Sequence, residues 1–127
     1  MLKAKDIMTA DIISVKEDTP IREALKLFVE HDISGMPVVE DDGTLVGILS
    51  EKDVITLFYE KQKGQGKTVS DFMTRPAIYF DVEDNLEAVC DFLVKNIFRR
   101  VPITSGGKLV GIISVRDVLK TILNPNL

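Results

Sequence analysis

Residues 6–9 of the chain read Asp-Ile-Met-Thr, and residues 71–74 read Asp-Phe-Met-Thr, 65 positions further on. The dipeptide Pro37-Val38 returns at the same spacing as Pro102-Ile103. Two separate blocks at one offset indicate that the second half of the chain repeats the first. Each later motif must therefore be examined together with its counterpart.

Two further blocks extend the repeat after one residue is lost in a turn. Leu-Val-Gly-Ile stands at residues 45–48 and again at 109–112. Ser-x-x-Asp stands at residues 50–53 and again at 114–117. Four matched blocks in the same order indicate a duplicated half-domain.

Each half reads as strand, helix, strand, strand, helix. In the first half, residues 13–15 alternate apolar and polar side chains as a short strand does. Thr19 is placed to be a helix N-cap with Pro20 at the first helical position, and apolar residues at helical spacing follow over 21–29. A hairpin is expected over residues 36–50, with a second helix after it.

The second half repeats these signals, with a strand over residues 78–82, Asp84 as N-cap and a helix over 86–95. A hairpin turns at residues 105–107, and the last helix starts from Ser114. Strands joined through a helix are expected to be parallel. The fold class is therefore α/β (α+β), with tandem β-α-β-β-α motifs packed with pseudo-twofold symmetry.

The repeat divides the chain into a first motif over 1–60, a linker over 61–70 and a second motif over 71–127. The linker carries three lysines among glycines and is expected to be a solvated connection. A half of this size has only one covered sheet face, so the two halves should close on each other as one compact domain. Their junction is expected to form two clefts, one for each repeat.

Composition excludes several classes of function. The 20 acidic and 16 basic residues give a net charge of −4, which disfavours nucleic acid, and no apolar run is long enough for a membrane span. We expect a cytoplasmic protein without a membrane partner. Cys90 and His31 are the only residues of their types, so neither a disulfide nor a Cys/His metal site is expected. Cys90 fits a core thiol, and His31 fits a solvated or capping residue at a helix end.

The chain shows no enzyme signature. No nucleophile, base and orienting group are placed together, and Gly64-Gln65-Gly66-Lys67 lacks the spacing and the preceding strand of a P-loop. We therefore expect no catalysis.

Ser-x-x-Asp at the opening of a helix has two interpretations. It is close to a capping box, in which both residues satisfy amide groups at the helix start. Alternatively, the serine caps while the aspartate turns outward and accepts the hydroxyls of a ribose. Spacing alone does not decide between them.

In their order, these four blocks resemble the CBS motif, and the two copies together resemble a stand-alone CBS pair, or Bateman module. The resemblance runs from Asp6 to about Leu123. It implies a regulatory module that binds adenosine nucleotides (AMP, ADP, ATP or S-adenosylmethionine) in clefts between the repeats. It implies no required cofactor.

The resemblance also implies site residues. Asp53 and Asp117 would hold ribose, with Ser50 and Ser114 reaching ribose or phosphate. In one site, adenine would contact Thr9, Ala10, Ile12 and Ile13. In the other site, it would contact Thr74, Pro76, Ala77 and Ile78. Apolar walls would come from Met36 and Val101, beside the hairpin prolines Pro37 and Pro102.

Phosphate would be contacted by Arg99 and Arg100, with Lys52 and Arg116 as further candidates. The first repeat has Ser34 and Gly35 where the second has the arginine pair, so unequal sites are expected. A solvated surface pair is the alternative for the two arginines, since only one of them can face a cleft from a strand.

The leading hypothesis is that nucleotide occupancy is signalled to an unidentified partner protein or to a second subunit, in trans. The alternative is a structural or oligomerisation module whose clefts stay empty. A homodimer is expected in both cases, with apolar contacts from Leu27, Leu57, Phe92 and Leu119.

Overall fold

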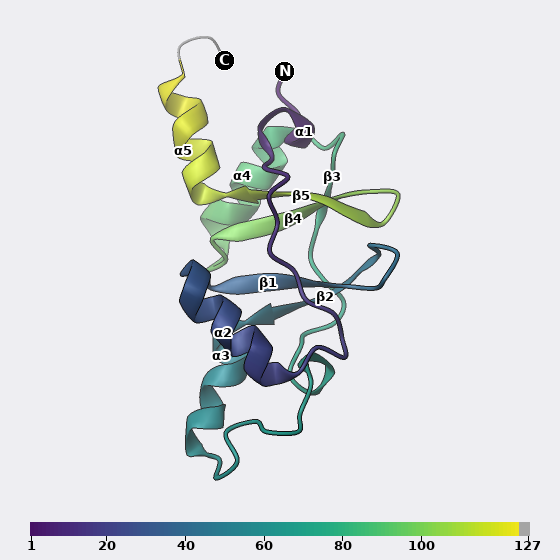
Figure 1. Ribbon diagram of the computed structural model, residues 1–127. Helices are drawn as coiled ribbons and strands as arrows, with labels where there is room; N and C mark the ends of the chain where they lie inside the picture. Colours follow the sequence, from purple (N-terminus) through teal and green to yellow (C-terminus); the bar gives the residue numbers. More distant parts are fainter. Residues whose placement is uncertain (125–127) are drawn as a thin grey trace. The chain divides into compact units, whose positions relative to one another are not determined.

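The structure is a computed structural model that describes residues 1–124 (Figure 1). Residues 125–127, the end of the expected second motif, lie outside the described residues. The chain forms two compact units. Unit 1 consists of Met1–Ile12 and Ile78–Leu127, and unit 2 consists of Ile13–Ala77.

Unit 2 is built on the antiparallel hairpin of β1 (Gly35–Val39) and β2 (Leu45–Ser50). Val15 adds a single parallel bridge to β1 at Val38. Helix α2 (Ile21–His31) packs its apolar face on the hairpin, because Ile21, Ala24 and Phe28 recur at helical spacing. The buried core of unit 2 consists of Val15, Ile21, Ala24, Phe28, Ile33, Met36, Val38, Leu49, Val54, Leu57 and Val69.

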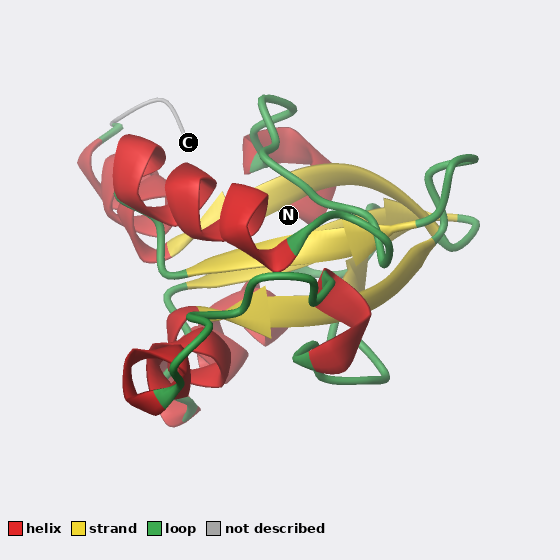
Figure 2. Ribbon diagram, turned by 60° about the horizontal axis from the view of Figure 1, so that its bottom comes forward, coloured by secondary structure: helices red, strands yellow, loops and turns green. Residues whose placement is uncertain are grey.

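Unit 1 has the same order of elements. Its strands are β3 (Phe80–Asp81), β4 (Arg100–Ser105) and β5 (Lys108–Ser114), with β3 parallel to β4 and β4 antiparallel to β5. Its helices are α1 (Ala4–Ile7), α4 (Leu86–Lys95) and α5 (Val115–Leu123). Its buried core consists of Ala4, Val89, Leu93, Val101, Ile103 and Ile113. Helices flank the hairpin strands of each unit in Figure 2, and the expected β-α-β-β-α class is confirmed.

The N-caps expected at Thr19 and Asp84 are each wrong by one residue. Helix α2 has Pro20 at its N-cap, because the Thr19 hydroxyl accepts from Lys16 N–H instead of capping the helix. Helix α4 has Asn85 at its N-cap, whose side chain accepts from Glu87 N–H, while Asp84 accepts from Asp81 N–H. In both places, the neighbouring polar side chain stabilises the preceding turn.

The helix after the first hairpin is shorter than its counterpart. Helix α3 (Glu51–Val54) gives way to the 3₁₀ helix η1 (Ile55–Tyr59), whereas α5 continues for nine residues. The β-branched run Val-Ile-Thr at 54–56 has low helix propensity, which accounts for the early end of α3.

Three expectations about apolar residues need correction. Val29 and Val94 were part of expected core faces but are 83% and 78% exposed. Leu57, expected to contact a partner, is buried in the core of unit 2. Leu119 is exposed as such a contact requires, and Cys90 is only half-buried rather than a core thiol.

The expected solvated linker over 61–70 packs on unit 2. Val69 is fully buried, and Gly64 is buried against Ile21 and Leu57. Backbone bonds run from Ile21 N–H to Lys67 C=O and from Val69 N–H to Thr19 C=O. This stretch includes the start of the 3₁₀ helix η2 (Val69–Asp71). The whole stretch belongs to unit 2.

The boundaries of the two units differ from those of the sequence repeats. Each unit contains a segment that stands, in the sequence, before the hairpin of the other unit. We call residues 1–12, in unit 1, and residues 67–77, in unit 2, the exchanged segments. The segment over 1–12 crosses β5 (Figure 1), where Thr9 forms a single antiparallel bridge with Ile112. Corresponding backbone bonds attach both segments, such as Ala4 N–H to Asp84 C=O and Val69 N–H to Thr19 C=O.

Candidate functional site

Each hairpin has one face in its unit's core and a second face turned away from it, because side chains alternate along a strand. In β4, Val101 and Ile103 are core residues, so Arg100 and Pro102 lie on the second face. In β1, the core residues are Met36 and Val38. We call the second face the site face.

The site face of each unit also carries the residues opposite these positions in the neighbouring strand. In unit 1, Arg100 is opposite Ser114 and Pro102 is opposite Ile112. In unit 2, Gly35 is opposite Ser50 and Pro37 is opposite Ile48. Directly opposed residues point to the same side of a sheet. The start of the Ser-x-x-Asp motif therefore shares a face with the hairpin proline in both units.

The exchanged segments add a threonine to the edge of each hairpin. Thr9 and Ile112 exchange two backbone hydrogen bonds, each of 2.9 Å. Thr74 and Ile48 exchange two bonds of 2.8 and 3.0 Å. Thr9 therefore lies beside the second Ser-x-x-Asp motif, and Thr74 lies beside the first. Residues from both sequence repeats meet within each unit.

The Ser-x-x-Asp motifs form capping boxes. Ser114 N–H donates to Asp117 Oδ2 at 2.8 Å, and Asp117 N–H donates to Ser114 Oγ at 3.1 Å. The corresponding bonds between Ser50 and Asp53 are 2.8 and 3.3 Å. Of the two interpretations of Ser-x-x-Asp, the capping box is confirmed and the outward-turned aspartate is wrong, because the amide at the helix start needs an acceptor and the carboxylate supplies it.

Capping uses only one oxygen of each carboxylate. Among the described residues, Oδ1 of Asp53 and of Asp117 has no hydrogen-bond partner. Both side chains are half-buried. A carboxylate oxygen accepts more than one bond, so each aspartate retains capacity to bind a hydroxyl group.

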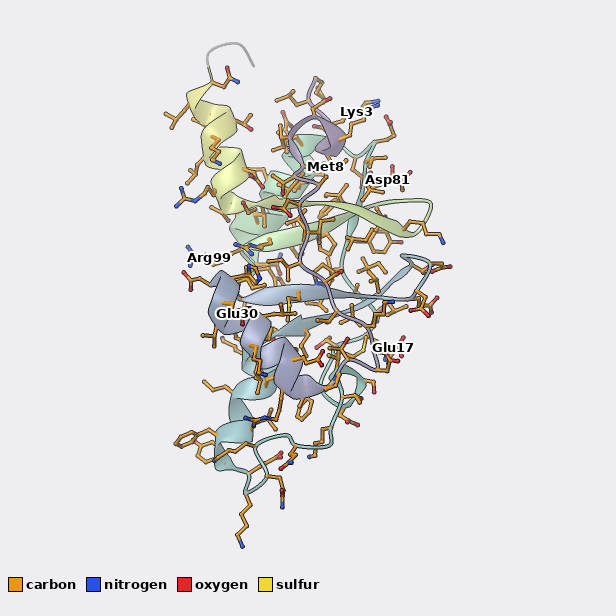
Figure 3. All side chains as sticks on the ribbon, viewed as in Figure 1. Lys3, Met8, Glu17, Glu30, Asp81 and Arg99 are labelled. Atoms are coloured by element: carbon orange, nitrogen blue, oxygen red, sulfur yellow. The ribbon has the colours of Figure 1, made fainter. Side chains whose placement is uncertain are left out.

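Three of the four basic residues expected at the site, Arg99, Arg100 and Arg116, lie in unit 1. Arg99 lies just before β4, where its backbone C=O accepts from Val115 N–H at the start of α5 (Figure 3). Neither Arg99, Arg100 nor Arg116 makes a hydrogen bond or ion pair through its side chain among the described residues, and all three are exposed. Their charges are available to an anion.

Unit 2 has no such cluster, since Ser34 and Gly35 take the corresponding places and Lys52 is its only basic candidate of those expected. Lys52 is exposed.

Most of the expected site residues fall into two groups. Unit 1 contains Thr9, Ala10, Ile12, Arg99, Arg100, Val101, Pro102, Ser114, Arg116 and Asp117. Unit 2 contains Met36, Pro37, Ser50, Lys52, Asp53, Thr74, Pro76 and Ala77. Two residues are separated from their expected groups: Ile13 packs against the core of unit 2, and Ile78 belongs to unit 1.

Two expected wall residues have no surface to offer a ligand in this conformation. Met36 is 0% and Val101 is 1% exposed, because both face the cores. Pro37 and Pro102 on the site face are buried as well, and the half-buried apolar side chains of that face are Ile48 and Ile112, which were not predicted from the sequence. Their signal in the sequence is the last residue of Leu-Val-Gly-Ile, two positions before the serine.

Ion pairs anchor both exchanged segments. In unit 1, Glu83 binds Lys3 at 2.6 Å and Lys5 at 2.7 Å, and these two bonds lower the pKa of Glu83 from 4.5 to about 2. In unit 2, Arg75 binds Glu17 at 3.0 Å and lowers the pKa of that carboxyl. All of these side chains are partly exposed, so each pair contributes modestly to stability.

Within residues 1–124, no group of three or more His, Cys, Asp or Glu side chains is placed to hold a metal ion. No helix in that part of the chain is long and apolar enough to cross a membrane.

This fold and its duplicated motifs define a family. Residues 4–60 and 69–124 match the CBS domain, and the chain belongs to the CBS domain family. It is 34% identical, over 93% of its length, to MJ1225 of Methanocaldococcus jannaschii. It is 32% identical, over 93% of its length, to an inosine-5'-monophosphate dehydrogenase of the same organism. The chain spans 42% of the first relative and 23% of the second.

Solved structures similar to this chain include complexes with adenosine compounds. CBSX2 from Arabidopsis thaliana, in complex with AMP, is 35% identical with a TM-score of 0.86, and 97% of each chain is covered. The CBS pair of MJ0100, in complex with 5'-methylthioadenosine and S-adenosyl-L-methionine, is 27% identical with a TM-score of 0.78, and 96% of each chain is covered.

Proposed function

We propose that this chain is a regulatory module that binds adenosine nucleotides, one on each unit, and signals their occupancy to a partner protein or a second subunit. The ligand class follows the AMP and S-adenosylmethionine complexes of similar CBS pairs. The chain needs no catalytic group for this function.

The observation that carries the proposal is the meeting of an exchanged segment with a Ser-x-x-Asp motif inside each unit. In unit 1, Asp117 would accept a ribose hydroxyl through Oδ1 while Oδ2 continues to cap α5. Adenine would lie on the site face against residues 9–12 and Ile112, with Thr9 held beside Ile112. In unit 2, the ribose would bind Asp53. Adenine would lie there against Ile48 and the segment from Thr74.

The proposal includes unequal sites. Arg100 lies opposite Ser114, where the ribose and its phosphate would meet. The backbone C=O of Arg99 accepts from Val115 N–H, next to Ser114, and Arg116 follows Ser114 by two residues. Charge-assisted bonds to phosphate are stronger than neutral ones. Unit 1 would therefore prefer phosphorylated ligands, while unit 2 would bind mainly through the nucleoside.

Thermal unfolding and calorimetry test this function. AMP, ADP, ATP and S-adenosylmethionine are each added to the full chain, with inosine monophosphate as a control for adenine recognition. A ligand at about 100 times its Kd stabilises the folded state by about 2.7 kcal/mol, which raises the Tm by several degrees. No shift and no binding heat with any of the four would contradict the proposal.

The alternative, a structural or oligomerisation module, has one observation in its favour. Large apolar side chains are exposed in both units. In unit 2 they include Ile55, Phe58 and Tyr59, and in unit 1 they include Val94, Ile97, Phe98, Leu119, Ile122 and Leu123. Such surface suits contact with a second copy. Sedimentation without ligand tests it, because a dimer that forms without ligand and binds no nucleotide would favour this alternative.

A further inference from the structure

Each exchanged segment carries a methionine directly before its threonine, and a glycine lies against that methionine. A side-chain carbon built at Gly111 would lie 2.5 Å from Met8 Sδ and 2.8 Å from Met8 Cγ. One built at Gly47 would lie 2.3 Å from Met73 Cε and 2.6 Å from the carbonyl oxygen of Thr74. Unbonded carbon atoms pack at about 3.5–4.0 Å, so no side chain fits at either position.

Conformation does not explain these glycines. Neither Gly47 nor Gly111 has a positive φ, unlike five other glycines in the chain. Any residue could adopt their strand backbone. Space for the exchanged segment is therefore the reason for glycine at both positions.

We propose that Gly47 and Gly111 are positioning residues for the adenosine ligand, because they let the exchanged segments dock in the register that the site needs. This inference rests on the proposed function. Gly111 directly precedes Ile112, which bonds Thr9, and Gly47 directly precedes Ile48, which bonds Thr74. If an added side-chain carbon displaces the segment, these backbone bonds break. The threonine then no longer lies beside the Ser-x-x-Asp motif.

The two contacts differ in what opposes an added carbon. At Gly111, the three nearest atoms belong to the Met8 side chain, and shortening Met8 to alanine removes Sδ and Cγ and leaves only Cβ, at 3.0 Å. At Gly47, one close atom is the Thr74 carbonyl oxygen, which accepts from Ile48 N–H at 3.0 Å. Shortening Met73 cannot remove a backbone atom. The structure therefore predicts that a second substitution rescues only one unit.

Hydrogen exchange of the Thr9 and Thr74 amides measures segment docking without any ligand. Gly111→Ala should reduce protection of the Thr9 amide by about tenfold or more and leave Thr74 nearly unchanged. Gly47→Ala should do the reverse. Gly35→Ala is the control for both, since its added carbon would meet only the Leu49 carbonyl oxygen at an ordinary 3.6 Å.

AMP affinity, measured by calorimetry on the same proteins, tests the link to the ligand. Gly111→Ala should weaken AMP binding to unit 1 by about tenfold. Adding Met8→Ala to Gly111→Ala should recover much of both the protection and the affinity. Adding Met73→Ala to Gly47→Ala should recover neither.

If Gly111→Ala does not fold, Met8→Ala alone tests the same contact. It should reduce both the protection of the Thr9 amide and the affinity for AMP, by a smaller factor than expected for Gly111→Ala. Release of the segment with unchanged AMP affinity would overturn the inference while leaving the proposed function intact. So would unchanged protection in Gly111→Ala. If the unaltered chain binds no adenosine ligand, the proposed function fails, and the ligand role of the glycines fails with it.

Discussion

Units 1 and 2 share a scaffold but differ at the edge where a phosphate would lie. Both hold a threonine beside Ile112 or Ile48, and both have a capping Ser-x-x-Asp motif. Only unit 1 places an arginine opposite the serine, whereas unit 2 has Gly35 there. The comparison teaches that the parts proposed to bind the nucleoside repeat within the chain, while the arginine proposed to bind phosphate occurs in one unit.

The serines differ as well. The Ser114 hydroxyl lies 3.0 Å from Asp117 Oδ2 and donates to it. Among the described residues, the Ser50 hydroxyl donates no such bond. Ser50 can therefore donate its proton to a ligand oxygen without giving up an existing bond.

The largest expected effect comes from removing the carboxylates. Asp117→Ala should weaken AMP binding to unit 1 by about 1.5–3 kcal/mol, because a charged hydrogen-bond acceptor is lost. It should also lower stability by about 0.5–2 kcal/mol, since Ser114 N–H loses its acceptor. Asp53→Ala should have the same two effects in unit 2. Calorimetry and thermal unfolding measure them separately.

Asp117→Asn separates capping from ligand binding. Its amide oxygen can still accept from Ser114 N–H, so the Tm should stay close to that of the unaltered chain. Its NH₂ group offers a donor where a ribose hydroxyl would donate, so affinity should fall. Normal AMP binding by Asp117→Asn would show that the aspartate is only a cap.

The arginine difference can be reversed by exchange. Arg100→Ala should weaken AMP binding to unit 1 by about 1 kcal/mol, roughly fivefold, and leave adenosine binding unchanged. Gly35→Arg should strengthen AMP binding to unit 2, since a Cβ at Gly35 meets only the Leu49 carbonyl oxygen at an ordinary 3.6 Å and the new charge lies opposite Ser50. Equal loss of adenosine and AMP in Arg100→Ala would contradict a phosphate role.

A smaller effect concerns acid stability. The folded-state pKa of Glu83 is about 2 against an ordinary 4.5, so its pairs with Lys3 and Lys5 are complete above pH 4.5 and are lost as the pH falls toward 2. Attachment of the exchanged segment in unit 1 should weaken over that window. Carbon-13 shifts of the Glu83 carboxyl should give a midpoint near 2. Titration near 4.5 would show that the pairs do not persist in solution.

The smallest effect concerns the early end of α3. Ile55 is 70% exposed, and Ile55→Ala should favour the α-helical form there by a few tenths of a kcal/mol. Circular dichroism should show slightly more helix with AMP affinity unchanged. Leu119→Ala on α5 is the control, because α5 already continues for nine residues. An equal gain in helix content from this change would show that the helix propensity of Ile55 does not cause the early end of α3.

The repeated blocks allowed the hairpins, the helices and both Ser-x-x-Asp motifs to be predicted, because these depend on local side-chain patterns. The exchange of segments could not be predicted this way. Residues 6–9 fit either hairpin equally well, since the two Leu-Val-Gly-Ile strands have the same sequence. Only the three-dimensional connection shows that Thr9 pairs with Ile112.

Other differences have local physical causes. The spacing of Ser-x-x-Asp allowed a capping box to be predicted as one of two interpretations, and the choice was decided by the Ser114 amide, which takes Asp117 as its acceptor. Residues 61–70 looked solvated because glycine and lysine dominate, yet Gly64 leaves room for Ile21 and Leu57. The site assignments, the cytoplasmic location and the homodimer stay predictions.

The central claim is that residues from both repeats form one adenosine site within each unit. Intermolecular NOEs between AMP and the chain's methyl groups test it most directly. The account predicts adenine contacts to Thr9, Ala10 and Ile112 that disappear in Asp117→Ala and survive in Asp53→Ala. Contacts to Thr9 that depend on Asp53 instead, or no contacts to either exchanged segment, would contradict it.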